Sequence, residues 1–128
     1  MKQVIDIETI ELRWSDWHKF ETLKLHPKKS DVKVPKESGV YEVKCAGEQI
    51  RLTIGKAKNI NDRVRNGLIK QSIQHSAGKK IKSSFSEGEH DTILVRWALT
   101  IRPAATEEEL HRLYKNAFGK LPTYTSWT

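Results

Sequence analysis

Apolar and polar side chains alternate in two short runs near the middle of the chain. The runs are GVYEVKC at 39–45 and IRLTIG at 50–55, with AGEQ between them. Alternation puts every second side chain on one face of a strand, and a short link containing glycine suits a tight turn. The pattern predicts an antiparallel hairpin that includes Cys45, the only cysteine.

A helix is predicted directly after the hairpin. Asn59 is a good N-cap residue, and Asp62 follows where an acid favours the start of a helix. Ile60, Val64 and Leu68 then recur every four residues, which gives the helix one apolar face.

A buried strand and a second helix complete the predicted order of elements. DTILVRWALT at 91–100 is the most apolar run and predicts a central strand with Trp97 in the core. The helix is predicted from 103 to 118, with Gly119 at the C′ position. Its apolar stripe would consist of Leu110, Leu113, Tyr114 and Ala117. A small antiparallel sheet of three strands flanked by helices, an α+β fold, is therefore expected.

Residues 1–37 are expected to form an N-terminal extension to a main domain at 38–128, because the stretch 26–39 is rich in lysine and proline. Residues 3–12 are strand-like, and Trp14, Trp17 and Phe20 follow at helix-like spacing. So short a segment buries little by itself. Its aromatic residues are expected to pack on the main body or to form a homodimer interface.

Charge is distributed unevenly along the 128 residues, whose net charge is +7. Residues 51–82 hold nine lysines and arginines against one acid, Asp62. Such a segment attracts polyanions, although a merely solvated basic face would look the same. The single cysteine favours a reducing, cytoplasmic setting, and neither a signal peptide nor a membrane span is predicted.

Two charged residues lack an obvious structural reason. Among three consecutive acids, Glu109 would complete a capping box with Thr106 and Glu108 would face solvent. Glu107 lies closest to the apolar stripe, where a carboxylate needs a partner or a metal ion. Arg63 lies beside Val64 near the buried face, where its guanidinium could bind a phosphoryl group or simply cover the sheet.

The triplets GVY at 39–41 and TIG at 53–55, followed by GKAKNINDRV at 55–64, resemble the GIY-YIG nuclease domain. In that family's pattern, an arginine lies eight residues after the second glycine, as Arg63 does here, and a glutamate lies on a later helix, as Glu107 does. The resemblance covers residues 38–119 and is closest to the incision nuclease of bacterial excision repair.

The resemblance implies phosphodiester hydrolysis in nucleic acid, with DNA as the expected kind. Glu107 would hold one Mg2+ or Mn2+ ion, Arg63 would offset charge at phosphorus, and Tyr41 would orient or deprotonate the attacking water. The expected nucleic-acid-binding residues are Lys56, Lys58, Arg65, Lys70, Lys79, Lys80 and Lys82.

One departure from the family's pattern is Thr53, which stands where the second triplet usually begins with tyrosine. Tyr41 or Lys56 could replace that tyrosine in catalysis, the metal-bound water could suffice, or catalysis could be lost. Besides a nuclease, the sequence therefore allows a nucleic-acid-binding module with an impaired site. It also allows an interaction protein whose aromatic extension forms an oligomer interface.

Overall fold

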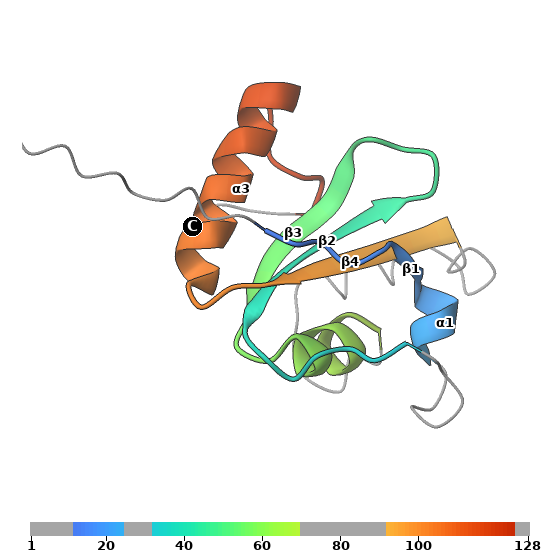
Figure 1. Cartoon of the computed structure of the whole chain (residues 1–128). Coiled ribbons are helices and arrows are strands. Elements are labelled where there is room, and N and C mark those ends of the chain that lie inside the picture. Colours follow the sequence, from blue (N-terminus) through green and yellow to red (C-terminus); the bar gives the residue numbers. More distant parts are fainter. Residues whose placement is uncertain (1–11, 25–31, 70–91, 125–128) are drawn as a thin grey trace, which may run out of the picture.

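A computed structural model describes residues 12–24, 32–69 and 92–124 (Figure 1). The elements are β1 (His18–Lys19), α1 (Phe20–Lys24), β2 (Gly39–Cys45), β3 (Arg51–Ala57), η1 (Asp62–Ile69), β4 (Ile93–Leu99) and α3 (Pro103–Phe118). None of the helices in these ranges has the length and apolar character needed to cross a membrane.

The sheet is antiparallel throughout and has the strand order β1-β4-β2-β3. The α+β fold and the hairpin of β2 and β3 are confirmed, as is the central position of β4. The expected number of three strands is wrong, because His18 and Lys19 pair with Val95 and Leu94 and so add a fourth strand at the edge. A strand of two residues is too short to be recognised from alternation.

The main core lies between the sheet and the pair α1 and η1, which Figure 1 shows beneath the strands. Trp97 is 6% exposed, as predicted for a core residue of β4. The largest aliphatic contributions come from Leu23, Val43, Ile60, Val64, Ile93 and Val95. This packing fixes η1, and with it Arg63, against the hairpin.

The aromatic residues of the N-terminal segment do not form one helical face. Phe20 begins α1 and is buried in the core, whereas Trp14 and Trp17 precede the helix. The Arg96 guanidinium lies 4.2 Å from the Trp14 ring centroid and 4.6 Å from that of Trp17. Lys44 also lies over Trp17. Cation–π contacts, rather than helical packing, thus account for both tryptophans.

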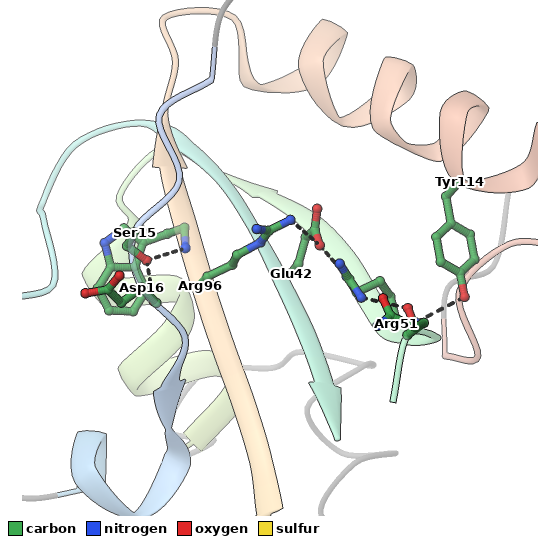
Figure 2. Close-up of polar contacts among 8 residues, drawn as sticks. Ser15, Asp16, Glu42, Arg51, Arg96 and Tyr114 are labelled. Carbon is green, nitrogen blue, oxygen red and sulfur yellow. Dashed lines mark hydrogen bonds and ion pairs between the residues drawn. The ribbon is translucent and has the colours of Figure 1, made fainter. Parts of the chain in front are cut away.

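A buried carboxylate links three strands on the same surface. Glu42 of β2 is 5% exposed, and its Oε2 accepts from Arg51 Nε at 2.5 Å and from Arg96 Nη2 at 3.2 Å. The Arg51 backbone N–H in turn donates to the hydroxyl of Tyr114 on α3 (Figure 2). The network connects β4, β2 and β3 with the last helix, so α3 is held in position by polar as well as apolar contacts.

The helix after the hairpin begins as predicted but has an unexpected winding. Asn59 Oδ1 accepts from the backbone N–H of Asp62 at 3.0 Å, which confirms Asn59 as the cap. From Asp62 the chain continues as a π-helix. The wider turn brings the neighbours Val64 and Arg65 to the buried side together. The side chain of Leu68 lies outside the described residues.

Helix α3 begins three residues before the proposed capping box. Pro103 occupies the first turn, and Thr106 Oγ1 donates back to the Arg102 carbonyl at 2.7 Å. Glu109 instead pairs with Arg112, so the capping box is wrong. The C-terminus is confirmed, since Gly119 has a φ of 78° and its N–H donates to the Lys115 carbonyl.

The buried face of α3 is rotated from the predicted stripe. Leu113 is 51% exposed and Ala117 is exposed, whereas His111 is buried. His111 Nε2 lies 2.8 Å from the carbonyl oxygen of Ile54 on β3. The imidazole of His111, rather than the side chain of Leu113, therefore packs against β3, because it forms a hydrogen bond with the backbone carbonyl of Ile54.

The outer edge of β3 is covered along its first half by the C-terminal segment. The backbone N–H groups of Thr123 and Tyr124 donate to the carbonyls of Arg51 and Leu52 at 3.1 and 2.7 Å. The second half of β3 runs towards the first residues of η1, where the candidate site lies.

Candidate active site

Tyr41 and Gly55, the last residues of the two triplets, face each other across β2 and β3. A Cβ atom on Gly55 would lie 2.3 Å from the Tyr41 hydroxyl oxygen and 2.4 Å from Cζ. The phenol ring thus lies over the glycine, where no other residue leaves enough space. The two triplets are therefore a matched pair, in which Gly55 allows the ring of Tyr41 to cross β3.

The phenol of Tyr41 is buried, with 2% of the residue exposed. Burial is the main cause that raises its pKa above the ordinary value, the charge of Arg63 lowers that pKa, and the charge of Glu107 raises it. Both charges act on the same hydroxyl, so η1 and α3 bring Arg63 and Glu107 into electrostatic range of Tyr41. The sequence left open whether these two charges would act on the same group.

A pocket of about 460 Å³ opens beside this group. The end of β3 contributes Lys56 and Ala57, the start of η1 contributes Arg63, and the first turn of α3 contributes Pro103 and Ala104. Lys58, Asn59 and Asp62 complete the lining. Three cations against one acid give the pocket a positive balance that suits an anionic ligand.

Glu107 is not one of the residues that line this pocket, but it lies one helical turn beyond two that do. It follows Pro103 by four residues on α3 and Ala104 by three, so all three side chains share one face of the helix. The carboxylate is half-buried, and no basic side chain of the described residues forms an ion pair with it. A half-buried carboxylate of this kind has capacity for a cation.

The carboxylate of Asp62 is already engaged. Its Oδ1 accepts from Asn66 Nδ2 at 2.6 Å, one turn further along η1. Within residues 12–24, 32–69 and 92–124, no three histidine, cysteine or acidic side chains come together as a metal-binding group. Any metal ion at this site would therefore depend on Glu107, water and the ligand for its coordination.

The expected nucleic-acid-binding residues separate into three groups. Lys56 and Lys58 are exposed and line the pocket. Arg65 is only 5% exposed, and its Nη1 donates to the Leu23 carbonyl at 2.7 Å, while Nη2 donates to that of Val32. Arg65 therefore connects η1 to the N-terminal segment. It was expected to bind phosphate, but its buried guanidinium has a structural role instead. Lys70, Lys79, Lys80 and Lys82 lie outside the described residues.

Thr53 lies two residues before Gly55 on β3 and is buried, at 4% exposure. It pairs with Val43, next to an irregularity in the register between β2 and β3. The threonine is thus part of the packed sheet and does not line the pocket.

Sequence reasoning missed the contribution of Pro103 and Ala104 to the pocket. The helix was predicted from 103, which agrees with the structure, but nothing in the sequence indicated that its first residues would meet the start of η1. Proline is favoured in the first turn of a helix, where its missing N–H costs nothing, so Pro103 carried the correct signal.

Comparisons with known proteins give a similarity of fold. No protein-family model matches the chain, and no curated protein matches it by sequence. Solved structures of the GIY-YIG N-terminal endonuclease domain of UvrC from Thermotoga maritima, each a point mutant bound to the catalytic divalent cation, are similar to it. Two share 23% and 24% identity, cover 73% of this chain and 88% of theirs, and have a TM-score of 0.48. A third shares 20% identity over 84% and 93%, with a TM-score of 0.45. Identities and TM-scores this low indicate a similar fold only. The chemistry of the site therefore has to follow from the residues of this chain.

Proposed function

We propose that the protein is a metal-dependent endonuclease that hydrolyses phosphodiester bonds in nucleic acid, with DNA as the expected substrate. The observation that carries the proposal is the basic pocket lined by Lys56, Lys58 and Arg63, supported by the action of the Arg63 and Glu107 charges on the pKa of the buried Tyr41 hydroxyl. Arg63, Glu107 and Tyr41 come from η1, α3 and β2, and packing of the sheet alone would not require two opposite charges around a buried phenol.

Glu107 fits the role of metal ligand. Its half-buried carboxylate is without an ion pair among the described residues, and hard divalent cations prefer oxygen ligands. Mg2+ in particular is commonly held by one or two carboxylates together with water and substrate phosphates. When bound, such an ion would polarise a phosphate oxygen and stabilise the leaving oxygen.

Arg63 would bind the scissile phosphate. Its planar guanidinium matches the oxygens of a phosphoryl group, and its position in the first turns of η1 is fixed by the buried neighbour Val64. A fixed cation directed at developing negative charge contributes more to the transition state than a mobile one.

Tyr41 would orient the attacking water in its neutral form. Because burial raises the pKa of its phenol, the hydroxyl keeps its proton at neutral pH and can donate or accept a hydrogen bond. Of the two roles considered for Tyr41, orientation is therefore favoured over deprotonation. Lys56, which is exposed one residue after Gly55 and lines the pocket, is the other side chain that the sequence offered for the role of the missing tyrosine.

The second candidate is a nucleic-acid-binding module without catalysis. Thr53 favours it, because its buried side chain lies within the sheet and offers no phenol to the pocket. In that case Lys56, Lys58 and Arg63 would still hold phosphates, and Glu107 would have no catalytic role.

The proposal is tested by incubating supercoiled plasmid and labelled branched DNA with the protein and Mg2+, Mn2+ or EDTA. We expect metal-dependent nicking that falls at least ~100-fold in Glu107→Gln and in Arg63→Ala, the usual cost of losing a group that stabilises the transition state. Glu108→Gln is the matched control, since Glu108 is the exposed neighbour of Glu107. DNA binding with no cleavage by any form of the protein would favour the second candidate. Cleavage that survives both substitutions would remove the site from consideration.

A further inference from the structure

Two features around the candidate site exceed what holding a phosphate requires. The first is the apolar part of the pocket, formed by Ala57, Pro103 and Ala104. The second is Ile101, whose side chain is 92% exposed in the short link between β4 and α3. Ala57 also belongs to the hydrophobic core, whereas Ala104 and Ile101 are exposed.

The pocket is large enough for more than a phosphate group. An apolar cavity of about 150 Å³ already accepts a benzene molecule, and this pocket measures about 460 Å³. Its lining combines apolar residues with Lys56, Lys58 and Arg63, so it offers contacts both to a flat uncharged ring and to phosphates. A nucleotide combines these two kinds of surface.

A base can enter such a pocket only after it has left the stack. Proteins that unstack bases commonly insert an apolar side chain, isoleucine among them, between neighbouring bases of the stack. Ile101 precedes Pro103 by two residues, so the two Cα atoms lie within about 7 Å of each other. Leu99, which is 47% exposed, extends the same apolar surface along β4.

We infer that the pocket receives one unstacked nucleotide of the substrate and that Ile101 fills the vacated position in the stack. The preferred substrate is then nucleic acid with a nucleotide that leaves its neighbours easily, as at a bulge, a branch or a single-stranded end. This inference rests on the proposed function, because it assumes that the face with Arg63 binds nucleic acid.

The test measures binding in EDTA, where no metal-dependent cleavage occurs. One duplex carries a single bulged 2-aminopurine, and the reference duplex carries it paired. The fluorescence of 2-aminopurine rises when the base leaves the stack. We expect the fluorescence of the bulged duplex to rise several-fold when it is saturated with protein. We also expect the protein to bind the bulged duplex at least tenfold more tightly than the paired duplex.

Two substitutions with matched controls locate the effect. Ala104→Phe fills the pocket from an exposed helical position and should remove the preference for the bulged duplex, whereas Ala105→Phe, one residue away and outside the lining, should keep it. Ile101→Ser should abolish most of the fluorescence rise. Ile50→Ser is its control, because Ile50 is 40% exposed at the opposite end of β3.

The outcomes separate this inference from the proposed function. Equal binding of both duplexes, or unchanged fluorescence at saturation, would overturn the nucleotide pocket even if Mg2+-dependent cleavage is observed. Equal effects of Ala104→Phe and Ala105→Phe would overturn it as well. A fluorescence rise that depends on Ile101, without cleavage in Mg2+, would support the pocket in a protein that is not a nuclease.

Discussion

Substitution of Gly55 by alanine tests the pairing of the two triplets directly. The new methyl carbon would lie 2.3 Å from the Tyr41 hydroxyl oxygen, 2.4 Å from Cζ and 2.9 Å from Cε1. Ordinary contact begins near 3.4 Å, so the hydroxyl must move by about 1.1 Å. Tyr41 is buried, so the ring can move only by displacing packed neighbours.

Two opposing effects set the expected size of the change. Overpacking of a well-filled core costs roughly 1–3 kcal/mol, whereas alanine in place of glycine in a strand gains roughly 0.5–1 kcal/mol of backbone entropy. We expect a net loss of about 1–2 kcal/mol in the free energy of unfolding, measured by urea titration. If Tyr41 orients water, a shift of about 1 Å should also lower cleavage about 100-fold.

A double-mutant cycle with Tyr41→Leu shows whether the ring is the cause. Leucine lacks the atoms nearest to the new methyl group, so Gly55→Ala should be neutral or slightly stabilising in that background. The reasoning is refuted if Gly55→Ala alone is as stable and as active as the unmodified protein. It is also refuted if the same loss persists in the Tyr41→Leu background.

Three further predictions concern the core, the phenol and the arginine that the structure reassigned. Trp97→Ala should lower the free energy of unfolding by about 3–5 kcal/mol, and a loss below ~1 kcal/mol in a urea titration would contradict its core position. The pKa of Tyr41 is raised on folding, so its contribution to stability is complete below about pH 10 and decreases above it, by at most ~1.4 kcal/mol per pH unit. Urea midpoints from pH 9 to 11 should therefore fall more steeply for the unmodified protein than for Tyr41→Phe, and parallel curves would argue against burial of the phenol. Arg65→Met should lower the free energy of unfolding by roughly 2–4 kcal/mol and change the affinity for DNA little. Lys58→Met should leave the stability unchanged and reduce the slope of log K against log salt concentration by about one. The reverse pattern would mean that Arg65 contacts the nucleic acid.

The sequence predicted the elements whose side chains repeat regularly. The alternation in 39–45 and 50–55 gave the hairpin, and the apolar run around Trp97 gave β4, because burial on a sheet face imposes these periods. The helix cap at Asn59 and the end of α3 at Gly119 were also predicted, since each depends on one residue type with a defined backbone role.

Features that depend on contacts between distant residues were not predictable in the same way. Glu42 reads as a solvent-facing residue of a strand, but Arg51 and Arg96 bury it in an ion cluster. His111 reads as a surface residue of α3, but the Ile54 carbonyl draws it inwards. In each case the polar partner lies elsewhere in the chain, and a periodic pattern carries no information about it.

The candidate site was predicted by residue type but not by arrangement. The motifs indicated Tyr41, Arg63 and Glu107, and the charges of Arg63 and Glu107 both act on the Tyr41 hydroxyl. The pocket could not be predicted, because it depends on the start of α3 meeting the start of η1. Neither the π-helical winding of η1 nor the burial of Arg65 was predicted from the sequence.

The cover on the outer edge of β3 has a consequence for how the protein may be shortened. Thr123, Tyr124 and His111 satisfy carbonyl oxygens of Arg51, Leu52 and Ile54 that would otherwise be open to strand addition. A chain ending at Leu121 would retain every element of the fold but expose part of a β-strand edge beside the hairpin. Such a chain should self-associate at concentrations where the full chain does not, because Thr123 and Tyr124 would no longer cover this edge.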